Sequence, residues 1–181
     1  MERLETRLEG PILVRPVVHG DHRGFFQETY RRSVYAELGI PEEFVQDNQS
    51  RSGHGIVRGM HFQAGMAKLV RCGRGAILDV LVDLRRGSPT FGHWEAHELD
   101  DENHQQLYVP DGFGHGFCVT SETADVIYKC STYYDASIER RFKYDDPEVG
   151  IDWPDIELIP SERDAGAPLL SEIAEELPFR Y

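Results

Sequence analysis

The chain has 181 residues, 40% of them hydrophobic and 28% charged, and 32 acids against 19 bases give a formal net charge of -13. This length and composition suit a globular protein with one core, and we expect residues 1–181 to form a single domain. A surface of this charge repels a nucleic-acid backbone, and no apolar run is long enough to cross a bilayer, so neither nucleic acid nor membrane is an expected partner. The segment MERLETRLEG lacks the apolar centre of a secretory signal, which predicts a cytoplasmic protein.

Short β-rich segments follow one another along the chain. In order they are ILVRPVV (12–18), GFFQETY (24–30), KLVRC (68–72), AILDVLVDL (76–84), HWEAHEL (93–99), QQLYVP (105–110), GFCVT (116–120) and DVIYKCSTYY (125–134). Turn-forming clusters of Gly, Pro, Asp, Asn and Ser separate them, which favours an all-β sandwich or barrel over a parallel sheet with crossover helices. Helix signals are confined to 31–39 and 168–177, which predicts two short peripheral helices.

The segment AILDVLVDL places a carboxylate among apolar side chains. Asp79 shares a face with Ile77 and Leu81 by the period-two alternation of a strand. Such a carboxylate must find a partner or stay protonated. A satisfied structural aspartate and an orienting carboxylate for a site histidine both fit this position.

Two motifs are similar to the metal-binding motifs of cupin barrels. PDGFGH carries His115 in the spacing of one motif, whereas GMHFQAGMAK has Gln63 and Lys68 after His61, where a second histidine and a carboxylate are typical. Glutamine is a weak ligand and an ammonium group cannot coordinate, so we expect neither a metal nor another cofactor. A histidine beside a cation can instead abstract a carbon-bound proton while the cation stabilises the enolate oxygen.

Inversion at such a carbon also needs an acid on the opposite face. YKCSTYY offers three tyrosines, and period two puts Tyr128 and Tyr134 on one face of a strand with Tyr133 on the other. A phenol with a pKa near 10 is a suitable acid toward an enolate carbon, although tyrosine clusters in β-proteins are often packing residues.

A histidine base needs an acceptor on its second ring nitrogen, and a phosphorylated substrate needs cations. Spacing alone leaves three carboxylates open as the acceptor, namely Asp79, Asp83 and Asp164. Three arginines in Gly- or Ser-punctuated segments suit a diphosphate if they converge, and surface ion pairs if they do not; they are Arg23, Arg58 and Arg163.

These motifs resemble, in order and over about residues 10–170, the dTDP-4-dehydrorhamnose 3,5-epimerase family. The matching segments are DHRGFFQE, QDNQS, RGMHFQ, KLVRC, DVLVDLRRGSPTFG, PDGFGHGF, YKCSTYY, DPEVGIDWP and SERD. The resemblance implies a cupin-type jelly roll (a double-stranded β-helix) without metal, in a homodimer whose N-terminal strands exchange between subunits. It also implies a substrate, dTDP-4-keto-6-deoxyglucose, that is inverted at C3 and C5 on the way to dTDP-L-rhamnose.

The resemblance assigns roles position by position. His61 would be the base, paired with Asp164, and Tyr128 the acid on the opposite sugar face. Lys68 would stabilise the enolate at the 4-keto oxygen, and a second pair, His115 with Asp79, would line the sugar pocket. The nucleotide and diphosphate contacts would be Arg23, Phe26, Glu28, Gln46, Asn48, Arg58, Tyr134, Glu139 and Arg163, with Tyr134 stacked on thymine and the first three supplied by the exchanged strand.

One segment departs from the family. FQAGMA alone joins His61 to Lys68, a link shorter than in typical members and without their Pro-Pro pair. Strand turns tolerate such deletions, so the expected fold is unaffected. The alternatives that stay open are inversion at only one carbon, another nucleotide-linked 4-keto sugar, and a metal-dependent or purely sugar-binding cupin.

Overall fold

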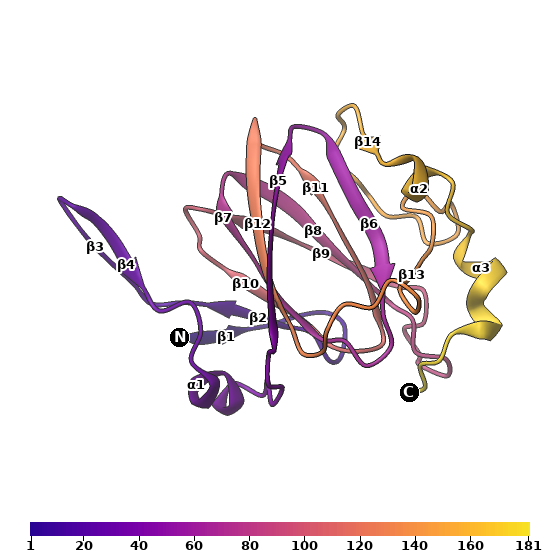
Figure 1. Ribbon diagram of the computed structural model, residues 1–181, viewed down its shortest axis with the longest axis horizontal. Helices are drawn as coiled ribbons and strands as arrows, with labels where there is room; N and C mark the ends of the chain where they lie inside the picture. Colours follow the sequence, from indigo (N-terminus) through magenta and orange to yellow (C-terminus); the bar gives the residue numbers. More distant parts are fainter.

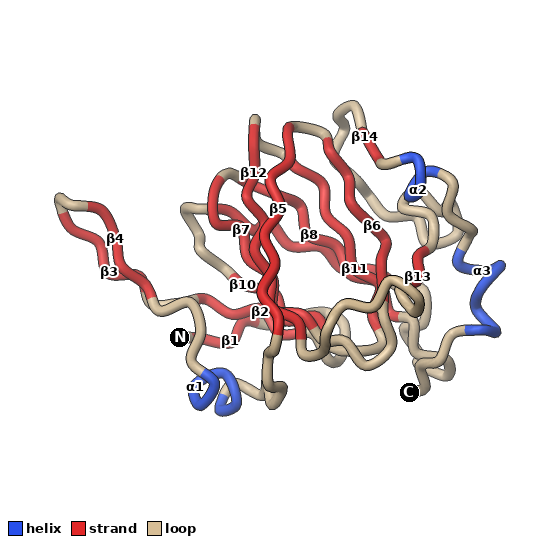
Figure 2. Tube along the Cα trace, viewed as in Figure 1, coloured by secondary structure: helices blue, strands red, loops and turns tan.

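The computed structural model describes residues 1–181, and most of its regular structure is β-strand (Figures 1 and 2). The strands are β1 Glu2–Leu4, β2 Ile12–Arg15, β3 Val18–Asp21, β4 Gly24–Gln27, β5 Gln46–Gly53, β6 Ile56–Phe62, β7 Lys68–Arg74, β8 Ala76–Asp83, β9 Trp94–Asp100, β10 Gln106–Val109, β11 Phe113–Val119, β12 Thr123–Cys130, β13 Arg140–Arg141 and β14 Ile159–Pro160. The helices are α1 Arg32–Glu37, α2 Glu162–Ala165 and α3 Leu170–Ile173, followed by the 3-10 turn η1 Ala174–Glu176. No helix is long and apolar enough to span a bilayer.

Two sheets face each other and form the body of the molecule (Figure 1). The first has the order β1-β2-β10-β7-β12-β5, and the second β13-β6-β11-β8-β9 with β14 added parallel to β6. Neighbours in the sheet order are often distant in sequence, as in a jelly roll, so the all-β prediction is confirmed.

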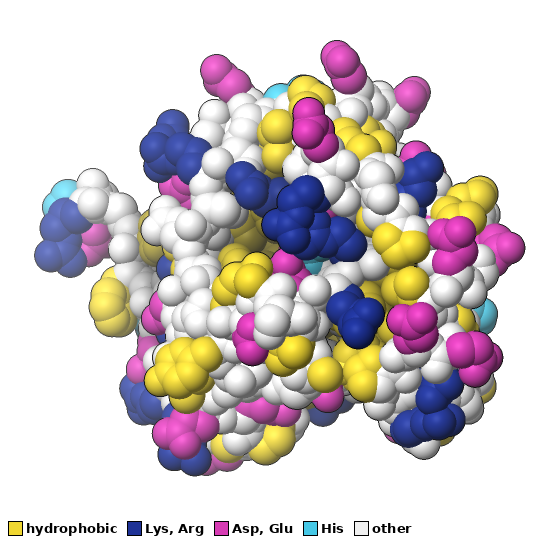
Figure 3. All heavy atoms as spheres, turned by 45° about the vertical axis from the view of Figure 1, so that its right-hand side comes forward, with side chains coloured by type: hydrophobic (Ala, Val, Ile, Leu, Met, Phe, Trp, Pro, Cys, Tyr) yellow, Lys and Arg dark blue, Asp and Glu magenta, His cyan; other side chains and the backbone are white.

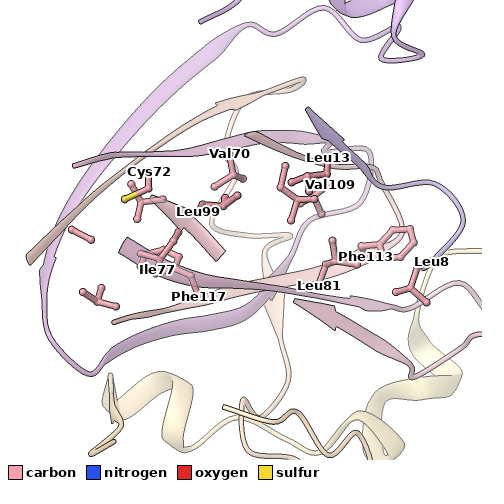
Figure 4. Close-up of a cluster of buried hydrophobic side chains, with 14 residues drawn as sticks. Leu8, Leu13, Val70, Cys72, Ile77, Leu81, Leu99, Val109, Phe113 and Phe117 are labelled. Atoms are coloured by element: carbon pink, nitrogen blue, oxygen red, sulfur yellow. The ribbon is translucent and has the colours of Figure 1, made fainter. Parts of the chain in front are cut away.

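The main core lies between the two sheets. Leu13, Val70, Ile77, Leu81 and Phe117 are among the buried side chains that meet there (Figure 4). β8 is apolar on both faces because its other side chains, such as Val80 and Val82, pack under the C-terminal segments on the outside of the second sheet. On the outside of the first sheet, Tyr35 of α1 covers a smaller cluster. Both sheets are therefore rigid supports for whatever projects between them.

The hairpin β3–β4 stands apart from this body (Figure 1). Its two strands pair only with each other, and the Phe25 and Phe26 side chains are 58% and 71% exposed. It contacts the body through His104: the Phe25 ring, close to the hairpin turn, lies 4.6 Å from the His104 ring, and Gln27 Nε2, at the base, lies 3.4 Å from His104 Nδ1. Adjacent exposed phenylalanines on an arm of this kind are unusual for an isolated chain.

Several predicted bounds were wrong. The segment 12–18 is broken after Arg15 because Pro16 cannot donate to the ladder, and Val18 begins the separate hairpin. The last predicted strand ends at Cys130, so Tyr134 lies in the following loop and the period-two argument for its orientation does not apply. The C-terminal helix is shorter than 168–177, and six elements were not predicted at all: β1, β5, β6, β13, β14 and α2.

Candidate active site

A cavity of about 290 Å³ opens between the sheets, where β5, β6, β7 and β12 meet. Its walls are Gln46, Asn48, His61, Phe62, Gln63, Met66, Lys68, Tyr128, Cys130, Tyr134 and Glu139. A second hollow of about 480 Å³ shares His61, Tyr134 and Glu139 with it and forms its mouth. This mouth adds Arg58, Arg141, Arg163 and Asp164, and Figure 3 shows Lys and Arg side chains gathered beside a hollow on this face.

His61 forms a short hydrogen bond with Asp164. The Nε2 atom lies 2.6 Å from Asp164 Oδ1, and the two side chains are 27% and 5% exposed. With the carboxylate ionised, Nε2 of the neutral imidazole carries the proton, which leaves the Nδ1 lone pair free to act as a base. The sequence candidates for the orienting acceptor thus reduce to Asp164.

The chain around Asp164 holds its carboxylate in place and keeps it charged. Asp164 lies in the first turn of α2, and its backbone N–H donates to the Oγ of the N-cap residue Ser161 at 3.1 Å. Burial alone would raise the pKa of Asp164, but hydrogen bonds from His61 and Ser161 and the charges of His61 and Arg141 outweigh it, so this pKa lies below its usual range. The aspartate is therefore an anion available to stabilise an imidazolium.

A second histidine–carboxylate pair lies beside the first. His115 of β11 is opposite His61 of β6, and its Nε2 contacts both oxygens of the fully buried Asp79, at 2.9 and 3.0 Å. β6 and β11 approach closely at two glycines, since a Cβ on Gly59 would lie 2.6 Å from Gly116 Cα. Asp79 is thus satisfied by His115, while the third candidate carboxylate, that of Asp83, binds Arg85.

Lys68 and Tyr128 face the cavity from adjacent strands. Lys68 is the register partner of Cys130 in the pairing of β7 with β12, and Tyr128 lies two residues before Cys130 on the same face. Burial lowers the pKa of Lys68 below its ordinary 10.5, against the opposing effects of Cys130, Asp79 and Glu139. Burial raises the pKa of the Tyr128 phenol, which therefore keeps its proton until a stronger base removes it.

The side chains expected to hold a nucleotide lie along the same cavity. The Tyr134 N–H donates to Gln46 Oε1 at 3.0 Å, and Gln46 Nε2 donates to Asn48 Oδ1 at 3.0 Å. The Tyr134 hydroxyl donates to Glu139 Oε2 at 3.2 Å. Arg58 and Arg163 both line the mouth of the cavity, next to His61.

Three of the predicted contacts are not at this cavity within one chain. Arg23 lies on the protruding hairpin and pairs with Asp21, Phe26 is among the most exposed side chains, and Glu28 pairs with Arg31. Of the three arginines considered for a diphosphate, only Arg58 and Arg163 meet within a single chain. Nor do three or more His, Cys, Asp or Glu side chains converge to form a metal site.

Comparison with known proteins places this arrangement in a family. The model of the dTDP-4-dehydrorhamnose 3,5-epimerase family matches residues 5–172. The chain belongs to this family. The Pseudomonas aeruginosa dTDP-4-dehydrorhamnose 3,5-epimerase is 48% identical over 172 residues, which cover 92% of this chain and 90% of that protein.

A solved relative extends the likeness to the whole fold. The dTDP-6-deoxy-D-glucose-3,5-epimerase of Legionella pneumophila, in complex with dTDP-4-keto-L-rhamnose, superimposes with a TM-score of 0.96 at 44% identity, covering 99% of this chain and 98% of that one. A dTDP-4-dehydrorhamnose 3-epimerase of Streptomyces niveus is also 44% identical over 169 residues, 91% of this chain and 82% of that protein. The cupin-like jelly roll is confirmed, and the family scaffold accommodates different epimerases.

Two residues of this dTDP-4-dehydrorhamnose 3,5-epimerase family member were not assigned their present place from the sequence. Arg141 sits at the cavity mouth, but in ERRFKYDD it resembles one charge of a solvated run. Gln63 was considered only as a poor metal ligand, whereas its amide bridges to the loop that carries Tyr134. The only sequence signal for this role of Gln63 was its position, as a polar residue directly after the apolar end of a strand.

Proposed function

We propose that this protein epimerises dTDP-4-keto-6-deoxyglucose at C3 and C5, next to the ketone, to dTDP-4-keto-L-rhamnose. The observation that carries the proposal is the His61–Asp164 pair at a cavity that also holds Lys68 and Tyr128. Family membership and the ligand of the Legionella pneumophila relative support this substrate. The protein is accordingly an isomerase.

The residues at the cavity supply each step of the inversion. His61 removes the proton from the carbon beside the ketone, and the electron pair of that C–H bond moves through the new C=C bond onto the ketone oxygen. The Lys68 ammonium stabilises the resulting enolate, and Asp164 stabilises the imidazolium. Tyr128 then donates its proton to the opposite face of the same carbon, so the ketone is restored with the configuration inverted.

The remaining residues would bind the nucleotide and diphosphate. Arg58 and Arg163 suit the diphosphate as bidentate donors, and Tyr134 would stack on thymine. Gln46, Asn48 and Glu139 would complete the polar wall, and the His115–Asp79 pair would line the sugar pocket. Arg23, Phe26 and Glu28 would reach this cavity from a partner subunit, in a cytoplasmic homodimer of single-domain chains that uses no metal or other cofactor.

A 3-epimerase acting on the same substrate is the second candidate. The relative from Streptomyces niveus bears that name. In this chain the shortened link between His61 and Lys68 forms the turn at residues 63–67, between β6 and β7. This turn lies on the cavity wall through Gln63 and Met66, so its length affects where the sugar ring can sit.

Solvent exchange distinguishes these possibilities. The protein is incubated with dTDP-4-keto-6-deoxyglucose in D2O, and NMR is used to locate deuterium in the sugar. We expect label at both C3 and C5; label at C3 alone would support the 3-epimerase, and no label at either carbon would refute the proposal.

Two controls accompany this assay. His61→Ala should lose exchange while retaining dTDP binding, which separates catalysis from a sugar-binding role. Activity that survives exhaustive chelation excludes the metal-dependent alternative.

A further inference from the structure

Arg141 lies directly beside the histidine of the cavity. It belongs to β13, which pairs with β6, and its register partner there is His61. Its side chain is only 14% exposed. An arginine this enclosed is normally held by specific acceptors, because its charge cannot be neutralised by losing a proton.

The guanidinium group of Arg141 contacts two carboxylates. Nη2 donates to Glu139 Oε2 at 3.0 Å, and Nη1 lies 3.9 Å from Asp164 Oδ1. Each of these oxygens has a second partner, the Tyr134 hydroxyl at 3.2 Å for Glu139 and His61 Nε2 at 2.6 Å for Asp164. Arg141 is therefore the middle of a continuous network from Tyr134 to His61.

Both ends of this network depend on the central cation. The Glu139 and Asp164 side chains are 17% and 5% exposed, so two anions approach each other in a partly dehydrated place. Without a cation between them they would repel each other and lose a fixed orientation. Among the lysines and arginines, only Arg141 lies within 4.0 Å of an Asp164 oxygen.

We propose that Arg141 is a positioning residue that joins the Tyr134–Glu139 pair to the His61–Asp164 pair. The inference rests on the proposed function, in which the first pair binds the nucleotide and the second abstracts the proton. Its charge, 3.9 Å from Asp164 Oδ1, also helps to hold the pKa of Asp164 below its usual range. The other charged or titratable groups around the pair are Arg58, Lys68, Asp79, His115, Tyr128, Cys130, Tyr134, Arg163 and the Glu139 carboxylate itself.

Three variants test this role. Arg141→Met removes the charge and keeps bulk, Arg141→Lys keeps the charge, and Arg140→Met is the matched control, since Arg140 is 61% exposed and only reaches Glu176 at 3.7 Å. In Arg141→Met we expect kcat for C3 and C5 exchange to fall about tenfold. The acid limb of its pH–rate profile should move up by about one pH unit, because the pair binds its proton more tightly. In Arg141→Lys the acid limb should return to its wild-type position. Arg140→Met should leave both kcat and the acid limb unchanged.

A double-mutant cycle tests whether the two pairs are joined. The effects of Glu139→Gln and Arg141→Met on kcat/KM should be clearly non-additive, because each breaks the same bridge. Additive effects would refute the joining role. A lower kcat in Arg141→Met with an unmoved acid limb would reduce Arg141 to a structural residue and overturn the inference.

One measurement separates this inference from the proposed function. NMR titration of the His61 ring needs no substrate, and the ring should take up its proton at higher pH in Arg141→Met than in the wild type or in Arg140→Met. Identical titrations would overturn the role of Arg141 even in an active enzyme. A wild-type protein without exchange would refute the function, while a shifted titration would still support the electrostatic effect of Arg141.

Discussion

Lys68 and Tyr128 face one cavity, and burial moves their pKa values in opposite directions. The pKa of Lys68 lies below 10.5, whereas that of Tyr128 lies above 10.0. Burial thus moves loss of the ammonium proton to lower pH and loss of the phenol proton to higher pH. If the enolate is stabilised by the Lys68 ammonium, the exchange rate must fall at alkaline pH as Lys68 loses its proton. This fall is the alkaline limb of the pH–rate profile.

We expect this alkaline limb to depend on the residue at position 68. In Lys68→Arg the limb should move to higher pH, because a guanidinium stays protonated throughout this range. In Tyr128→Phe the rate should fall while the limb stays in place. Lys68→Met should reduce kcat about 100-fold at every pH, as expected for loss of a group that stabilises the oxyanion. Rate profiles of the three variants decide the assignment, and a limb that disappears only in Tyr128→Phe would contradict it.

At the same scale, spacing could identify residue types but not their partners. The alternation in β8 correctly placed Asp79 on the inward face with Ile77 and Leu81. Its partner, however, lies on β11, and the partner of His61 is 103 residues further along the chain. No local pattern encodes such a contact, and the choice of Asp164 came from the SERD motif.

At the scale of elements, the short β6–β7 turn is tied to the loop that carries Tyr134. Gln63 is 5% exposed, its Nε2 donates to the Tyr133 carbonyl at 2.9 Å, and its Oε1 accepts from the Asp135 N–H at 2.9 Å. The Ala67 N–H also donates to Ser131 Oγ at 2.8 Å. Tyr134 is thus presented to the cavity by hydrogen bonds from the turn.

Gln63→Met should loosen this loop without touching the proton-transfer groups. It leaves two backbone groups without their partners, at a cost of about 1–3 kcal/mol, so the loop loses its fixed position. We expect the dissociation constant for dTDP to rise about tenfold, while kcat changes less than about threefold. Calorimetry with dTDP measures the first quantity, and Gln105→Met, at a glutamine whose side chain forms no hydrogen bond, is the control. An unchanged affinity would show that the turn does not position Tyr134.

Two of the strands that sequence patterns missed, β5 and β6, carry residues of the site. β5 is QDNQSRSG, an edge strand without an apolar residue, and β6 is interrupted by Arg58, Gly59 and His61. Hydrophobic alternation cannot reveal strands whose inward positions hold polar groups for a ligand. β7 and β8, by contrast, have inward positions filled largely by core residues and were predicted close to their observed bounds.

At the scale of the whole molecule, the arm formed by β3 and β4 projects from the body of its own chain and contacts it through His104. Phe26 and Arg23 are exposed there, away from the cavity at which the family resemblance would place them. Exchange of the arm between two subunits would bury the phenylalanines and bring Arg23 to the diphosphate. Each active site would then be built from the body of one subunit and the arm of the other.

Mixing two inactive variants tests this arrangement. His61→Ala disables the body, and the double variant Arg23→Ala/Phe26→Ser disables the arm. If arms are exchanged, each mixed dimer contains one wholly intact site and one doubly defective site. After random reassortment, half of the dimers are mixed, so activity should recover to about a quarter of the wild-type value. If each site uses the arm of its own chain, every site keeps one defect and the mixture stays inactive.

Each variant incubated alone through the same reassortment is the control, and sedimentation of the wild type establishes whether a dimer is present.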